Sequence, residues 1–168
     1  MEVVCMEIDS RIRTLDELVA LRATWAAEGK KVVWTNGCFD LLHAGHLRSL
    51  QEAKTLGDIL IVGVNSDRSV RLMKGEARPL VSERDRAELI AGLRPVDYVM
   101  IFDEPDPITA LSRLRPDIHC KGAEYADGTR PLPERDTVLS YGGEIRFLPI
   151  HSGRSTTGLI ERIINSHP

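Results

Sequence analysis

Two histidines, His43 and His46, stand three residues apart in the segment H-A-G-H. The pattern that follows predicts a helix over His46–Leu56, so both imidazoles should lie on one face of its first turn. Unpaired N–H groups and the helix dipole favour an anion at such a helix start. Two imidazoles there can also donate hydrogen bonds to phosphate oxygens as negative charge builds on them. The pair therefore predicts a site for phosphoryl transfer.

Two glycines belong to the same segment. Gly37 follows the predicted strand at 31–35 and can let the backbone turn tightly and approach a phosphate, while Gly45 leaves room beside the helix. The other interpretation is that both histidines are ordinary helix-terminal residues, as most single histidines are. An H-x-G-H pattern should arise by chance in fewer than roughly one in fifty chains of this length. The spacing therefore favours the functional interpretation.

The elements that would hold this segment alternate between strand and helix. Short β-rich runs are typical of buried parallel strands, and they occur at 31–35, 58–65, 98–102, 117–121 and 144–149. Helical patterns follow them at 46–56, 82–93, 107–114, 134–141 and 157–164. This alternation predicts an α/β fold, a Rossmann-like doubly wound parallel sheet in a single domain. Ligands of such sheets bind outside the carboxyl ends of the strands, where the H-A-G-H segment begins.

A further helical pattern precedes the first strand. Leu15–Glu28 carries apolar residues on one face, which should dock on the sheet. We expect residues 1–30 to form an N-terminal helical segment packed on the core, and residues 31–168 to form the domain that carries the chemistry.

The composition excludes several classes of protein. The chain has 168 residues, 42% of them apolar and 28% charged, which suits one soluble globular domain. No apolar run is long enough to cross a bilayer, and the acidic N-terminus lacks the basic start of a signal peptide. Three widely spaced cysteines suit reduced thiols, and a net charge of -3 gives no field for nucleic acid. We expect a cytoplasmic protein with no nucleic-acid or membrane partner.

Several separated motifs then follow one another in a specific order: T-N-G-C-F-D-L-L-H-A-G-H, G-D-I-L-I-V-G-V-N-S-D, D-R-A-E-L-I and G-R-S-T-T. They resemble the nucleotidyltransferases of the cytidylyltransferase-like superfamily, and most of all the adenylyltransferase domain of bacterial ADP-heptose synthesis, over about residues 15–164. The resemblance implies transfer of AMP from ATP to D-glycero-β-D-manno-heptose 1-phosphate, with release of pyrophosphate. It also implies Mg²⁺ with the ATP, a homodimer and a separate sugar kinase upstream. The product would serve carbohydrate metabolism, such as the synthesis of lipopolysaccharide.

The resemblance also implies roles for individual residues. The expected catalytic residues are His43, His46 and Lys74, and no residue is expected to bind a metal directly. The expected nucleotide-binding residues are Asn36, Gly37, Cys38, Phe39, Gly45, Lys121, Gly122, Arg154, Ser155, Thr156 and Thr157. The expected acceptor-binding residues are Asp40, Asp67, Arg86, Glu124 and Tyr125.

Most of these residues have a second interpretation. Lys74, expected on an irregular stretch, could be a solvated lysine, and Arg86 could form a surface ion pair. Asp40 could orient a histidine, help to hold Mg²⁺ or cap a helix, and Asp67 and R-S-T-T could also be caps. The segment K-G-A-E-Y at 121–125 departs from the family's usual K-G-G-D-Y, and the stretch 122–133 is a substrate loop or a surface connection. His119, His151 and His167 are interpreted as structural or exposed.

Three rival functions fit the same histidines. A glycerol 3-phosphate or other polyol-phosphate cytidylyltransferase would prefer CTP, and an FMN adenylyltransferase would bind flavin. A nucleotide-binding module would keep the fold without turnover. The presence of both histidines, Lys74 and R-S-T-T argues against that last alternative, because a module has no physical need to keep them all.

Overall fold

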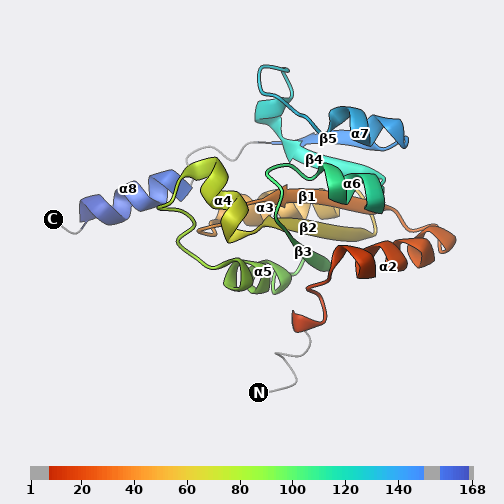
Figure 1. Ribbon diagram of the computed structural model, residues 1–168, viewed down its shortest axis with the longest axis horizontal. Helices are drawn as coiled ribbons and strands as arrows, with labels where there is room; N and C mark the ends of the chain where they lie inside the picture. Colours follow the sequence, from red (N-terminus) through yellow and green to blue (C-terminus); the bar gives the residue numbers. More distant parts are fainter. Residues whose placement is uncertain (1–7, 150–155, 167–168) are drawn as a thin grey trace.

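The computed structural model describes residues 8–149 and 156–166 (Figure 1). A five-stranded sheet lies at its centre, with every strand pair parallel and the order β3-β2-β1-β4-β5. The predicted Rossmann-like doubly wound α/β fold is therefore confirmed. The strands are β1 (Val32–Gly37), β2 (Ile59–Asn65), β3 (Tyr98–Phe102), β4 (Ile118–Gly122) and β5 (Glu144–Leu148).

Helices connect the strands and cover both faces of the sheet (Figure 1). They are α2 (Leu15–Ala27), α3 (Ala44–Lys54), α4 (Asp67–Lys74), α5 (Glu83–Ala91), α6 (Ile108–Leu114), α7 (Arg135–Ser140) and α8 (Thr156–Ser166), with a 3₁₀ turn η1 (Ala123–Tyr125) after β4.

Each face of the sheet has its own apolar core, because neighbouring residues of a strand point to opposite sides. Val33 of β1 belongs to the core that includes Leu50 of α3 and Ile90 of α5. The next residue, Trp34, belongs to the core that includes Leu18 of α2 and further residues of α6. Packing on both faces fixes the carboxyl ends of the strands, and with them the loops that follow.

Helix α2 precedes the sheet and packs on it. Thr14 and Glu17 form a capping box at its start, in which each side chain accepts a hydrogen bond from the other residue's backbone N–H. Leu18 and Trp25 are buried in the core of that face. The apolar face predicted for this segment thus contributes two large core side chains.

Two helices differ from the sequence-based expectation. Helix α3 begins at Ala44, two residues before the predicted start, with His43 as its N-cap residue. Helix α4 was not predicted, and the expectation that Lys74 lies on an irregular stretch is wrong because this residue ends α4. Helix α4 has only eight residues, of which Ser69 and Val70 alone are buried, so the segment is too short to show a sustained helical pattern.

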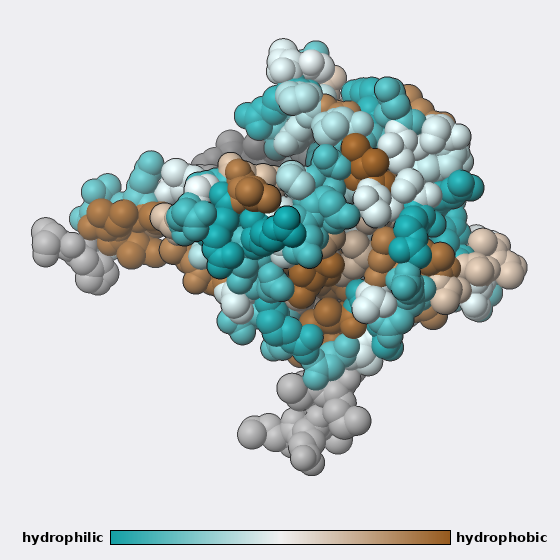
Figure 2. Space-filling view, viewed as in Figure 1, coloured by the Kyte–Doolittle hydropathy of each residue, from teal (hydrophilic) through white to brown (hydrophobic). Residues whose placement is uncertain are grey.

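Helix α8 contributes no buried residue among those described. Ile163 and Ile164 are more than half exposed, and the space-filling view shows hydrophobic colouring along this helix (Figure 2). In the described part of the chain, no helix combines the length and the apolar character needed to cross a membrane.

Candidate active site

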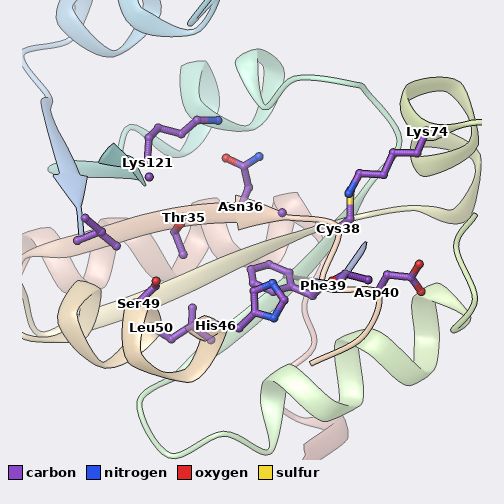
Figure 3. A pocket seen from close by; sticks show the side chains of 14 residues that line it. Thr35, Asn36, Cys38, Phe39, Asp40, His46, Ser49, Leu50, Lys74 and Lys121 are labelled. Atoms are coloured by element: carbon purple, nitrogen blue, oxygen red, sulfur yellow. The ribbon is translucent and has the colours of Figure 1, made fainter. Parts of the chain in front are cut away.

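A cavity of about 250 Å³ opens at the carboxyl end of β1 (Figure 3). Strand β1, helix α3, the end of α4 and the end of β4 supply most of its wall, so elements distant in sequence converge there. Its lining residues are Thr35, Asn36, Gly37, Cys38, Phe39, Asp40, His46, Ser49, Leu50, Lys74, Lys121, Gly122, Leu148 and Thr156.

The two histidines are stacked at the start of α3. Their ring centroids lie 3.9 Å apart with an interplanar angle of 16°. His46 lines the cavity, whereas His43 lines a neighbouring apolar pocket with Leu42, Leu47 and other residues. The edge of Phe39 packs against His46 with centroids 5.4 Å apart. These contacts hold the His46 ring in one orientation beside the cavity.

The surroundings of His46 decide its protonation. Its Nδ1 accepts a hydrogen bond from the backbone N–H of His43 at 3.4 Å, which places the proton of the neutral ring on Nε2. Burial, together with the charges of His43 and Lys74, lowers the pKa of His46 to about 4. At neutral pH this residue is therefore a neutral imidazole that can donate one hydrogen bond through its Nε2–H.

Lys74 brings a positive charge to the same cavity. It ends α4, and the next residue, Gly75, has a φ of 91°, a conformation that glycine adopts without strain. Figure 3 shows its side chain directed toward Cys38 and into the cavity that His46 lines. This arrangement places one ammonium and one imidazole donor around a single space.

The turn after β1 differs from the one expected at Gly37. Gly37 is still part of the strand, and the left-handed residue is Phe39, with a φ of 49°. A Cβ added to Gly37 would lie 3.2 Å from the Phe39 ring, so the absence of a side chain lets that ring pack close to the strand. Gly45 is buried in the first turn of α3.

A second cavity, of about 390 Å³, adjoins the first at the ends of β1, β2 and β4. Both cavities share several lining residues, among them Lys74, Lys121 and Gly122. The second cavity is also lined by Glu124, Tyr125 and residues of α4. The structure thus brings Glu124 and Tyr125, expected to bind the acceptor, beside residues expected to bind the nucleotide, such as Lys121. Two adjoining spaces with shared lysines suit two phosphorylated substrates.

Asp40 lies at the cavity wall but is engaged with the protein. Its side chain is 1% exposed, Oδ2 accepts from Arg78 Nε at 2.5 Å, and Oδ1 accepts from the backbone N–H groups of Leu80 and Val81. Burial raises the pKa of Asp40, but these hydrogen bonds outweigh it and leave the pKa lowered. These contacts hold the loop after α4 against the loop after β1, and the expected binding of the acceptor by Asp40 stays a prediction.

Arg86 and Asp67 form a buried network beneath the site. Arg86 is fully buried and donates to the backbone oxygens of Cys38, Asn65 and Val81, and its Nη2 lies 2.7 Å from the Asp67 carboxylate. These contacts engage the guanidinium within the protein, and the expected contact of Arg86 with the acceptor stays a prediction. Its position four residues before the buried Ile90 is the sequence signal that could have indicated burial.

The R-S-T-T segment is described only in part. Thr156 lines the first cavity, and its hydroxyl donates to the backbone oxygen of Leu41 at 3.3 Å. Thr157 is exposed at the start of α8. Arg154 and Ser155 lie outside the described residues, as do His151 and His167.

Sequence reasoning missed several residues of the site. The first cavity is also lined by Thr35, Ser49, Leu50 and Leu148. The only sequence signal for these residues is their position on a predicted strand or helix. Within residues 8–149 and 156–166, no group of three or more His, Cys, Asp or Glu side chains could hold a metal ion.

The comparisons with known proteins agree with this geometry. Residues 34–144 match the family described as Cytidylyltransferase-like. The chain belongs to this family. The match begins in β1 and ends at the start of β5. It includes every residue that lines the second cavity, and all residues that line the first except Leu148 and Thr156.

Relatives extend the match to almost the whole chain. "Bifunctional protein HldE" of Syntrophotalea carbinolica is 47% identical over 162 residues, which are 96% of this chain and 33% of that protein. The protein of the same name from Geobacter sulfurreducens is 45% identical over 162 residues and is covered to 32%. The chain thus spans about a third of the length of these curated relatives.

Solved structures show the same fold. The lipopolysaccharide core biosynthesis protein from Thermoplasma volcanium GSS1 is 29% identical with a TM-score of 0.59, over 73% of this chain and 97% of that one. Pantoate-beta-alanine ligase from Francisella tularensis has a TM-score of 0.58 at 16% identity, over 88% of this chain and 69% of that one. The second likeness concerns the fold alone.

Proposed function

We propose that this chain is an adenylyltransferase that transfers AMP from ATP to D-glycero-β-D-manno-heptose 1-phosphate and releases pyrophosphate. One observation carries the proposal: Lys74 and Lys121 line two adjoining cavities at the carboxyl ends of the strands, and His46 lines the first of them. The choice of substrates is supported by the motif resemblance to ADP-heptose synthesis and by relatives named HldE at 45–47% identity.

The proposed reaction needs no covalent intermediate. An oxygen of the acceptor phosphate attacks the α-phosphorus of ATP in line, a new P–O bond forms, and the bond to the leaving pyrophosphate breaks. Such transfers depend mainly on positioning and on stabilisation of developing charge. In this proposal the Nε2–H of His46 donates to an α-phosphate oxygen and the Lys74 ammonium offsets the charge of the leaving pyrophosphate; the proposal is supported by the position of both residues in the wall of the first cavity.

Mg²⁺ enters this proposal with the ATP. The described residues offer no carboxylate cluster for it, and both Asp40 oxygens are already bonded to Arg78 and to backbone N–H groups. Phosphate oxygens of the nucleotide would therefore supply most of its ligands, as is usual for Mg²⁺ with nucleotides. Its contribution would be to screen charge on the phosphates.

The proposal extends to the protein's surroundings. We propose that a sugar kinase activity supplies the heptose 1-phosphate, as the family resemblance implies; the relatives, of which this chain spans about a third, are named bifunctional. The homodimer, the cytoplasmic location and the use of ADP-heptose for lipopolysaccharide stay predictions from the family resemblance.

The test is pyrophosphate release with heptose 1-phosphate as acceptor, measured separately with ATP, CTP and GTP. We expect a clear preference for ATP that His46→Ala abolishes. A preference for CTP with glycerol 3-phosphate would replace the proposal by a cytidylyltransferase. Release that persists in His46→Ala would remove His46 from the mechanism.

A further inference from the structure

A buried carboxylate closes the loop that follows β4. Glu134 lies at the end of the segment 123–133, directly before α7, and is 1% exposed. Its Oε1 lies 3.1 Å from Nε2 of His119 and 2.9 Å from Nζ of Lys121. One oxygen therefore joins the far end of the loop to two residues of β4. No sequence motif pointed to this residue.

The charge state of this cluster follows from its burial. His119 is fully buried, and burial lowers its pKa despite the hydrogen bond to Glu134, so its ring is neutral and donates through Nε2–H. Burial would raise the pKa of Glu134, but the hydrogen bond from His119 and the charge of Lys121 lower it to about 2. The cluster thus holds one ion pair, Glu134 with Lys121, and one neutral donor.

Lys121 is the member of the cluster that reaches the site. It lines both cavities, and its Nζ also lies 5.0 Å from the centroid of the Tyr125 ring, over which Arg130 lies at 5.9 Å. An ammonium has three donor hydrogens, so the bond to Glu134 leaves two for a ligand. A lysine without such an anchor would lose considerable side-chain entropy when it bound a phosphate.

We propose that Glu134 is a positioning residue, which fixes the Lys121 ammonium at the wall shared by the two cavities and so links the conformation of the 123–133 loop to substrate binding. The effect on turnover rests on the proposed function above. The placement of Lys121 by Glu134 is independent of that function. The competing explanation is that the ion pair only ties the loop to β4, with no influence on the reaction.

Kinetics of four variants separate these explanations. Glu134→Gln keeps the shape but removes the charge, and it should lower kcat/KM for the acceptor by about tenfold, the size expected for one charge-assisted hydrogen bond. If Glu134 acts through Lys121, the same substitution should change kcat/KM less than twofold in a Lys121→Met background. An equal loss in both backgrounds, or no loss in the single variant, would overturn the proposal.

His119→Gln is the matched control, because it removes the other donor to the same oxygen. We expect it to lower the melting temperature while kcat/KM stays within twofold of the unchanged protein. Equal kinetic losses in His119→Gln and Glu134→Gln would mean that loop stability alone matters, and would overturn the proposal.

A second readout needs no activity. The rate of reductive methylation at Lys121, followed by mass spectrometry on the full chain, should rise several-fold in Glu134→Gln, because the amine loses its anionic partner, and the other lysines serve as internal references. An unchanged rate would overturn the placement of Lys121 by Glu134. A raised rate in a protein that releases no pyrophosphate would support the placement while contradicting the proposed function.

Discussion

At the scale of single residues, the site depends on an imidazole that stays neutral. Burial, followed by the charges of His43 and Lys74, lowers the pKa of His46, and its Nδ1 already accepts a backbone hydrogen bond. In the proposed reaction it would contribute a fixed N–H dipole in place of a mobile charge. Such a preorganised donor suits charge that develops only in the transition state.

The first prediction concerns the titration of His46. NMR of the imidazole signals should give a pKa of about 4 in the free protein, and a higher pKa when a non-hydrolysable ATP analogue supplies negative charge. Because the pKa is lower in the folded protein than in the unfolded chain, protons favour unfolding. The stability due to this group is therefore complete above about pH 6.5 and is lost as the pH falls toward 4. A free-protein pKa near 6.5 would contradict this account of the site.

Some contacts of single residues could not be predicted from the sequence. The H-A-G-H spacing predicted both histidines on one face of a helix start, and the structure adds that their rings stack, with His43 as the N-cap residue of α3. The partners of Arg86 and Glu134 lie on other elements, such as the end of β2 and strand β4. Those pairs exist only once the sheet order is known, so no local pattern reports them.

At the scale of elements, α4 and the loop behind it bring Lys74 to the site. Asp67, the first residue of α4, accepts a hydrogen bond from Arg86, which fixes the start of the helix. Asp40 accepts a hydrogen bond from the backbone N–H of Leu80 and so holds the loop after α4. The four strands β1 to β4 were predicted well because their apolar runs are largely buried, whereas only Leu148 of the edge strand β5 is buried. Helix α4 was missed because most of its surface is exposed, so that tertiary contacts and a Ser66 cap define it.

The second prediction tests the position of Lys74. Lys74→Met should lower kcat about 10²- to 10³-fold, the loss typical of one donor to developing charge. Arg71→Met removes a cation from an exposed position of the same helix and is the control, with kcat expected to stay within twofold. Steady-state pyrophosphate release measures both variants. Similar losses in both would indicate a general charge effect in place of a specific contact.

The third prediction tests the network beneath the site. Arg86→Met should lower the free energy of unfolding by about 3–5 kcal/mol, because it leaves buried oxygens of Cys38 and Asn65 without a donor. Arg84→Met, on the exposed side of α5, should cost no more than about 1 kcal/mol. Urea unfolding gives both values. Equal costs would contradict the assignment of Arg86 as the buried anchor.

At the scale of the whole molecule, the strand order locates the site. The chain moves from β1 to β2 and β3 on one side, and then crosses to β4 and β5 on the other. Ligands of doubly wound sheets bind at this switch point, between β1 and β4. Here the two sides of the switch point are marked by His46, which follows β1, and by Lys121, near the end of β4. The position of the site could be predicted from the sequence. The wall shared by the two cavities could not, because it forms only when the loop after β4 is folded.

The most direct test of the central claim, transfer of AMP to a sugar phosphate, is to follow the acceptor's oxygen. Heptose 1-phosphate labelled with ¹⁸O in its phosphate would be incubated with ATP, Mg²⁺ and the protein, and the products analysed by ³¹P NMR and mass spectrometry. The account predicts ADP-heptose with ¹⁸O in the new bridge between the two phosphorus atoms, and unlabelled pyrophosphate. Absence of ADP-heptose, or ¹⁸O in the pyrophosphate, would contradict it.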